Sequence, residues 1–195
     1  MDFVLRSFEP SLRLLFAGVA GSEGKQIGME HLAKLCDFDE WRAFLRGLKF
    51  IGPDLTDRDG ALCFVNSRMA IVNGQSQKGK ERENNLPFEG FLEALVRLAM
   101  LKALPTDQEI TDSGQADAGA FLRALKEADE AAYKKFLLER RRVWPGEPIA
   151  GMELARCVEG LITLIFDIIE SRTVGDDDRV LSQAEVSEWV DHNLR

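Results

Sequence analysis

Oxygen-bearing side chains recur near the end of the chain at the spacing of a calcium-binding loop. They are Asp176, Asp178, Ser182 and Glu185. A twelve-residue calcium loop takes ligands from positions 1, 3, 5, 7, 9 and 12, and glycine at position 6 makes its turn. With Leu181 at position 8, the four residues fall at positions 3, 5, 9 and 12, but Val174 and Arg179 occupy positions 1 and 6. Two interpretations stay open: weak binding of one Ca²⁺ or Mg²⁺ ion by residues 174–185, or a solvated acidic turn before a helix.

A second stretch has the hydrophobic pattern of such a loop without its ligands. The sequence LPFEGFLEALVRLA, residues 86–99, has an aliphatic residue, then Phe-Glu-x-Phe, then an amphipathic helix. With Leu86 at position 8, Gly79 occupies position 1 and Gly90 occupies position 12. Neither can supply a carboxylate, so we expect this loop to keep its packing residues and to bind no calcium.

A third stretch, near the N-terminus, is interpreted in the same way. With Ile27 at position 8, Ala20 falls at position 1 and His31 at position 12, so this loop is also predicted to be empty. The aliphatic residue at position 8 pairs neighbouring calcium loops through a short β-bridge. We therefore expect short bridges at residues 26–27 and 180–181.

Helical patterns dominate the elements that would position these loops. Apolar spacing, capping residues and loop composition predict helices over 11–19, 29–36, 39–48, 57–69, 87–103, 118–128, 131–143, 152–171 and 182–192. The segment LPTDQEITDSGQADAG, residues 104–119, is the best linker candidate, with a boundary near Thr106. No segment has the length and alternation of a sheet strand. The sequence therefore predicts an all-α protein with units at 1–105 and 106–195.

Composition narrows the function classes. The chain has 195 residues, 45% of them hydrophobic and 30% charged, with a formal net charge of −8. An acidic chain argues against nucleic acid and anionic membranes, which both select positive fields. The three cysteines include no CxxC pair, which favours a reducing compartment. The N-terminus lacks the apolar run of a signal peptide, and the most apolar window, residues 161–169, is too short to span a bilayer. We expect a cytoplasmic protein.

One basic cluster stands out in this acidic chain. Its members are Lys134, Lys135, Arg141 and Arg142, at helical spacing. They predict a positive strip that docks an acidic partner helix or an acidic tail such as that of tubulin. The alternative is a solvated helix face whose cations pair with Glu127, Glu130 and Glu139.

No arrangement of residues typical of catalysis is present. His31 and His192 are the only histidines, and neither has a Cys, Asp or Ser at catalytic spacing. The sequence contains no P-loop, GxSxG, HExxH or GxGxxG motif. We therefore expect a protein that is not an enzyme. The ending Asn-Leu-Arg gives no natural stop signal, which leaves open that the chain is a fragment of a longer protein.

Residues 10–103 resemble a known family. The segments LRLLFAGVAGSEGKQIGMEHLAKLC, LTDRDGALCFVNSRM and LPFEGFLEALVRLA are similar in order and type to the degenerate double EF-hand of the tubulin polymerization-promoting protein family. They also resemble EF-hand-like modules in ciliary and flagellar proteins of protists. The resemblance implies a helical module that binds calcium poorly or not at all and associates with microtubules or axonemal partners.

Together these features predict two EF-hand-like helical units joined by at most very short β-bridges. The predicted function is a non-enzymatic, largely calcium-independent interaction or structural adaptor module. The resemblance places it in a ciliary or other cytoskeletal assembly. The alternative is a calcium-responsive regulator that binds one ion weakly through the loop 174–185.

Overall fold

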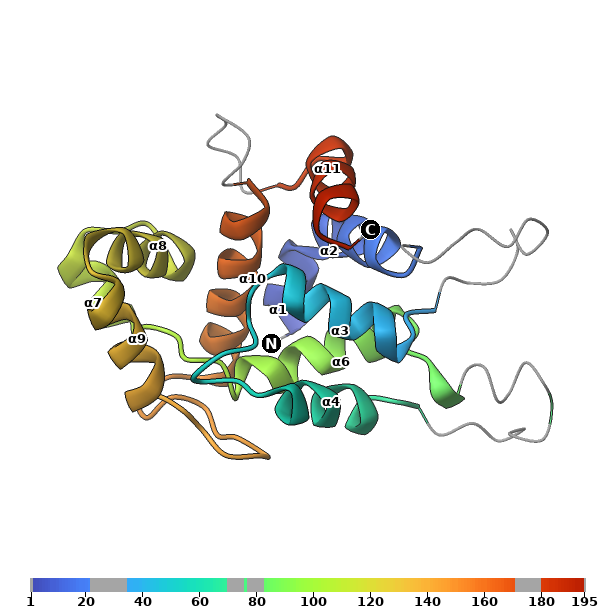
Figure 1. The fold of residues 1–195 in the computed structure, drawn as a ribbon, viewed down its shortest axis with the longest axis horizontal. Coiled ribbons are helices and arrows are strands. Elements are labelled where there is room, and N and C mark those ends of the chain that lie inside the picture. The colour runs from blue at the N-terminus through green and yellow to red at the C-terminus, as the bar shows by residue number, and fades with distance from the viewer. Residues whose placement is uncertain (1, 22–34, 70–75, 77–82, 171–179, 195) are drawn as a thin grey trace.

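The protein is helical, as the computed structural model shows for residues 2–21, 35–69, 76, 83–170 and 180–194 (Figure 1). Its helices are α1 (Asp2–Ser7), α2 (Glu9–Val19), α3 (Phe38–Gly47), α4 (Asp57–Asn66), α6 (Phe88–Ala99), α7 (Asp107–Ser113), α8 (Ala118–Ala128), α9 (Glu130–Glu139), α10 (Leu154–Glu170) and α11 (Gln183–Asn193). The described residues contain no strand, so the predicted all-α class is confirmed. No described helix has both the length and the apolar character needed to cross a membrane.

Capping boxes fix where several helices begin. In each box, the side chain of the N-cap residue accepts a hydrogen bond from the backbone N–H of the residue three positions later. The carboxylate of that later residue accepts a hydrogen bond from the backbone N–H of the N-cap residue. The pairs are Asp37 with Glu40, Thr56 with Asp59, Thr106 with Glu109, and Ser182 with Glu185. Each pair satisfies two donors that the first turn of a helix leaves without partners.

The segment predicted as a linker, residues 104–119, contains a helix that the sequence analysis does not predict. Thr106 caps α7, and Gly114 ends it in a left-handed conformation with φ of 68°. The acidic and polar residues of this segment suit a short exposed helix with acids in its first turn. The short helix α1 was not predicted either.

One isolated antiparallel bridge joins two helix–loop–helix segments, α2 to α3 and α4 to α6. Cys36 and Leu86 exchange two backbone hydrogen bonds, each 2.8 Å long. Leu86 is the residue assigned to position 8 of its loop, and its partner is Cys36. Residues 26–27 and most of the predicted helix 29–36 lie outside the described residues, and Cys36 itself is in the bridge and not in a helix.

The bridge expected at residues 180–181 does not form. Instead, the backbone N–H of buried Leu181 donates to the Oγ atom of Ser11, 3.0 Å away. Because Ser11 lies in α2, this bond ties the start of the last helix to the first helix–loop–helix segment.

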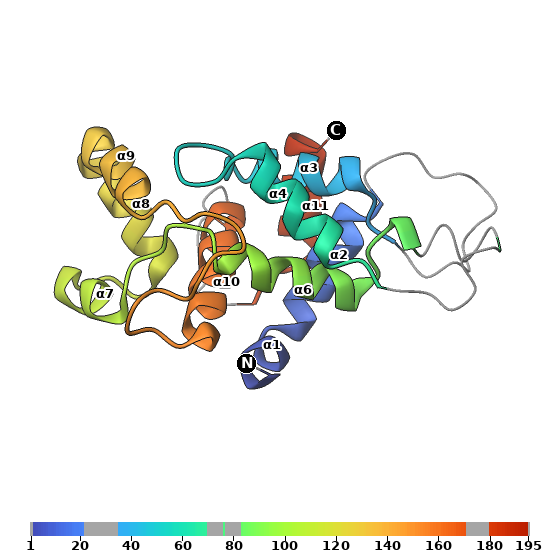
Figure 2. The same ribbon diagram turned by 90° about the horizontal axis from the view of Figure 1, so that it is seen from below.

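A single hydrophobic core runs through these segments. Phe91 of α6 lies at its centre, with its ring 5.4 Å from that of Phe16, 5.8 Å from Trp41 and 5.7 Å from Phe44. Helix α10 stands between α7–α9 on one side and the remaining helices on the other, and both views show this order (Figures 1 and 2). Because α10 packs on α6 and α11 packs on α2 and α3, the core continues across the boundary predicted between 105 and 106.

Candidate functional site

Helix α11 packs on α2 and α3, and the apolar surface that these two helices present to it is called the groove. Its buried face consists of Val186, Trp189 and Val190, which have the i, i+3, i+4 spacing of one helix face. The Trp189 ring meets that of Phe44 edge-on, with centroids 6.1 Å apart. The groove therefore holds an amphipathic helix that belongs to the same chain.

Two glycines allow α11 to approach this closely. A Cβ atom on Gly18 of α2 would lie 2.9 Å from Cγ1 of Val186 and 3.0 Å from Cγ2 of Val190. A Cβ atom on Gly47 of α3 would lie 3.2 Å from the Trp189 ring. Glycine inside a helix costs about 1 kcal/mol relative to alanine, so its presence at Gly18 fits a need for space.

The predicted calcium ligands are only partly placed. Asp176 and Asp178 lie outside the described residues. Ser182 and Glu185 are close together, because they form the capping box of α11: one carboxylate oxygen of Glu185 accepts from both the backbone N–H and the Oγ–H of Ser182, each at 2.7 Å. The structure thus gives these two residues a helix-capping role.

Carboxylates from three helices lie near the end of α10, where the segment 171–179 begins. The pKa of Glu170 is raised, chiefly by burial and then by the charges of Glu185, Asp167 and Asp117. Asp167 forms an ion pair with Arg123 at 3.1 Å. Among the described residues, no three His, Cys, Asp or Glu side chains gather closely enough to hold a metal ion.

The observed bridge corrects the register assigned to the N-terminal loop. If Cys36 and not Ile27 takes position 8, position 12 becomes Glu40 and position 1 becomes Met29. Glu40 is buried, and its carboxylate accepts the N–H of Asp37 at 2.9 Å. The Asp-x-x-Glu spacing before an apolar helix was the sequence signal for this residue. Met29 at position 1 offers no carboxylate, so in the corrected register this loop is still predicted to bind no calcium.

The predicted basic strip loses one member. Lys134 and Lys135 are exposed and pair with Glu130 at 2.8 Å and Glu139 at 3.7 Å, as the solvated-face alternative expected. Arg141 is also exposed, but Arg142 turns inward and donates to the carbonyl of Met100 at 3.3 Å.

Two apolar side chains lie among the cations of this strip. Leu138 is 58% exposed and Val143 is 82% exposed. The remaining surface, defined as Lys134, Lys135, Leu138, Arg141 and Val143, is called the α9 surface. It offers both charge and apolar contact to a partner.

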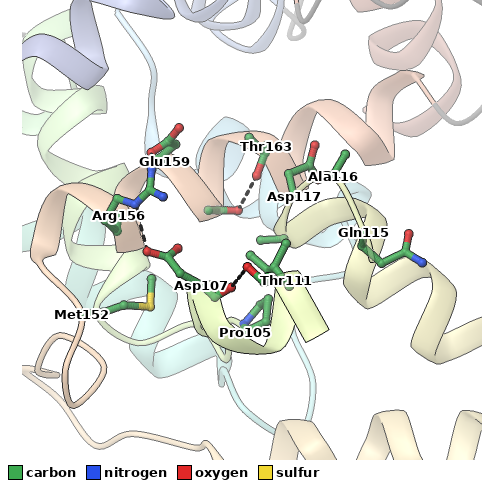
Figure 3. Close-up of a pocket in the computed structure, with 13 residues that line it drawn as sticks. Pro105, Asp107, Thr111, Gln115, Ala116, Asp117, Met152, Arg156, Glu159 and Thr163 are labelled. Atoms are coloured by element: carbon green, nitrogen blue, oxygen red, sulfur yellow. Dashed lines mark hydrogen bonds and ion pairs between the residues drawn. The ribbon is translucent and has the colours of Figure 1, made fainter. Parts of the chain in front are cut away.

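A cavity of about 240 Å³ lies between α7, α8 and α10, and charged side chains in its lining form ion pairs with one another (Figure 3). Arg156 donates to Asp107 at 3.1 Å and to Glu159 at 2.6 Å, and these bonds raise the pKa of its guanidinium. Thr111 donates to the carbonyl of Asp107 at 2.8 Å. Since these polar groups satisfy one another, their arrangement joins α7 to α10.

Comparison with protein-family models, with curated proteins and with solved structures found no match for this chain. A functional assignment therefore depends on the geometry of the groove and of the surfaces around it.

Proposed function

We propose that this protein is a non-enzymatic interaction module with a degenerate EF-hand-like frame, whose groove between α2 and α3 binds an amphipathic helix. One observation carries the proposal: α11 occupies that groove through Val186, Trp189 and Val190. Recognition of a helix in a groove uses anchors at this spacing. The frame acts without calcium, because glycine and methionine occupy ligand positions of its two loops.

The occupied groove defines the chemistry of a competing partner. A helix that replaces α11 needs a bulky aromatic anchor flanked by β-branched residues, because the groove fits Trp189 beside Val186 and Val190. The partner helix must also approach α2 closely, because the space above Gly18 has no room for side chains larger than those of α11. Since α11 is tethered, its effective concentration is in the millimolar range, and a partner binds appreciably only when α11 is loosened.

A labelled peptide of residues 180–194 tests the groove directly. The full-length protein with Val186→Asp places a charge at the α11 interface, so α11 should leave the groove and the peptide should bind in its place. The wild-type protein should bind the peptide at least about tenfold more weakly, because its own α11 competes. Fluorescence anisotropy measures both affinities.

Gly18→Leu combined with Val186→Asp is the matched control for this experiment. The leucine fills the groove, so it should abolish peptide binding although α11 has been released. A peptide carrying Trp189→Ala should also fail to bind. Equal binding by Val186→Asp with and without Gly18→Leu would refute the groove as the site, provided that circular dichroism shows both variants to be helical.

The cytoskeletal setting is part of the proposal and is supported by the family resemblance and by the α9 surface. Lys134, Lys135 and Arg141 suit the acidic tails of tubulin or another acidic cytoskeletal partner. Co-sedimentation with microtubules should fall when all three are changed to glutamine, and it should fall equally when the acidic tails are removed from the microtubules. Sedimentation that is unaffected by both changes would reject tubulin tails as the partner.

Calcium-responsive regulation through residues 174–185 is the second candidate. The observation that favours it is the group of carboxylates around Glu170, to which Glu185 contributes. Glu185→Gln keeps the capping box, which accepts Glu or Gln, while it removes the charge. Isothermal titration of calcium into chelator-stripped protein should give heat that disappears in this variant. No heat in the wild-type protein would leave only the calcium-independent module.

A further inference from the structure

A second cavity, of about 380 Å³, opens on the other side of α8 from the paired charges described above. It is formed by the residues that follow α3 and α6 and by parts of α8, α9, α10 and α11. Its volume lies within the range of about 300–1,000 Å³ that is common for small-molecule sites. Its charge and its apolar walls indicate what it binds.

Cations dominate the lining of this cavity although the chain is acidic overall. Lys49, Lys102, Arg123 and Lys126 face a single lining carboxylate, that of Asp167. Arg123 is compensated by Asp167 at 3.1 Å.

Lys102 is compensated in a similar way. Its side chain is only 4% exposed, and its ammonium pairs with Asp54 behind the cavity wall at 2.8 Å. Burial lowers the pKa of this ammonium, and the charge of Asp54 opposes that change.

The other two cations in the lining are not compensated in this way. In the part of the chain that the structure describes, neither Lys49 nor Lys126 forms an ion pair. Lys126 lies 5.7 Å from the centre of the Tyr133 ring, and the nearby Glu130 pairs with Lys134 instead. Among the described residues, therefore, no carboxylate forms an ion pair with either of these two ammonium groups.

Lys49 also has an unusual backbone. Its φ is 57°, and it is the one non-glycine residue with positive φ among the described residues. It follows the end of α3, where the N–H of Phe50 returns to the carbonyl of Leu45 at 2.9 Å. Glycine is the usual residue at such a position, and a left-handed lysine costs about 1–2 kcal/mol. Such strain is found where the side chain has a function.

Apolar groups form the remaining wall. Phe50, Leu122 and Trp189 are buried side chains that line the cavity from three different elements. Tyr133 adds a phenol, which is a neutral hydroxyl at pH 7 and whose pKa is raised further, chiefly by burial. The cavity thus combines an apolar surface with cations at Lys49 and Lys126.

We propose that this cavity binds a small organic anion, in which a carboxylate, phosphate or sulfonate group is carried on an apolar body. The anionic group lies between the ammonium groups of Lys49 and Lys126, and the apolar body lies against Phe50, Leu122 and Trp189. This site differs from the groove of the proposed function, because neither Gly18 nor Val186 lines it, although Gly47 and Trp189 contribute to both.

Three probes distinguish the contribution of the anionic group from that of the apolar body. The amphipathic anion 8-anilinonaphthalene-1-sulfonate should bind one site per chain with an affinity that falls as salt is added. Its uncharged analogue N-phenyl-1-naphthylamine should bind at least about tenfold more weakly, because the charge-assisted contacts are missing. Inorganic phosphate, which lacks an apolar body, should also bind more weakly. Equal binding of the charged and uncharged probes would overturn the proposal.

Variants of the two lysines test the location. Lys49→Gly and Lys126→Gln should each weaken binding of the sulfonate probe about tenfold. Lys49→Gly should do so without lowering the melting temperature, because glycine adopts the left-handed conformation freely. Arg58→Gln, at an exposed arginine outside the cavity, is the control with the same change of charge and should bind as the wild type does. Unchanged affinity in both lysine variants would overturn the proposal.

Nuclear magnetic resonance can report the location of the probe directly, because each of the three tryptophans gives its own indole N–H signal. The probe should shift the indole N–H signal of Trp189, assigned with Trp189→Phe, and leave that of Trp144 in place. A shift confined to Trp144 would place the probe elsewhere and overturn the proposal. The peptide experiment on the groove uses other variants, so this inference and the proposed function can fail separately.

Discussion

Replacing Gly18 with alanine tests whether α11 and α2 are as closely packed as the structure shows. The substitution adds one methyl group in the last turn of α2, and it has two opposed effects. Alanine favours the helix over glycine by up to about 1 kcal/mol. The new Cβ atom, however, would lie 2.9 Å from Cγ1 of Val186 and 3.0 Å from Cγ2 of Val190, which is shorter than a normal carbon–carbon contact.

The unfavourable effect should be the larger one. Overpacking a core by one methyl group costs about 1–3 kcal/mol, because neighbouring side chains must leave their preferred rotamers. After the gain in helix propensity, we expect Gly18→Ala to lower the free energy of unfolding by about 1 kcal/mol. Gly52, which lies in the loop between α3 and α4, is the control for a methyl group added where there is room, because a Cβ atom there would meet nothing within 4 Å. Gly52→Ala should leave the free energy of unfolding nearly unchanged.

A double-mutant cycle with Val186→Ala isolates the contact. Alone, Val186→Ala should cost about 1.5 kcal/mol, the transfer free energy of the two carbons removed. In the Gly18→Ala protein the same change also removes the methyl group at 2.9 Å, so it should cost at least about 1 kcal/mol less. Urea denaturation measures all four proteins. Additive changes, with a coupling near zero, would refute the packing of α11 on α2.

Three further predictions concern buried charges and thiols. Lys102→Met should lower the free energy of unfolding by about 3–5 kcal/mol in urea titrations because it leaves Asp54 buried without a cation, and adding Asp54→Asn should recover most of the loss. The pKa of Glu170 is raised in the folded state, so the wild-type protein should lose stability as pH rises above 4.5. Glu170→Gln should therefore be more stable than the wild type at pH 7 and equally stable below pH 4.5. Thermal melts across that pH range measure both proteins. Burial raises the pKa of the Cys36 thiol and raises that of Cys63 to about 12, so Ellman's reagent should label the native protein slowly at pH 8 and the urea-unfolded protein at once.

Local signals in the sequence predicted the amphipathic helices but not the short helices α1 and α7. The predicted range 118–128 coincides with α8, because Asp117 caps its first turn and its apolar residues keep helical spacing. The predicted helix 57–69 was three residues too long, since α4 ends at Asn66. The helix α7 was missed because its seven residues bury no side chain, so its segment has no apolar periodicity to detect.

Pairing between distant segments could not be predicted in the same way. Bridges were expected at residues 26–27 and 180–181, whereas the observed bridge joins Cys36 to Leu86, and this pairing depends on how α3 is placed in space. The occupied groove was not predicted, since nothing local links Gly18 to Val186 across most of the chain. Arg142 was assigned to a surface for a related reason: its charge was visible in the sequence, but the carbonyl of Met100 that it reaches was not.

Trp189 connects the groove to the cavity. One helix, α11, supplies the ring that fills the groove beside Phe44 and that also forms part of the cavity wall. Release of α11, as in Val186→Asp, removes that wall, so this variant should bind the organic anion less tightly than the wild type does. The peptide of residues 180–194 returns the Trp189 ring to the groove and should restore the affinity for the anion. Linkage requires the converse: the anion must strengthen peptide binding to Val186→Asp by the same factor. Adding the sulfonate probe should therefore raise the peptide affinity of Val186→Asp, and it should not do so when Lys49→Gly is also present. A fall of the peptide affinity in both proteins would show that the probe competes in the groove itself and does not act through the cavity.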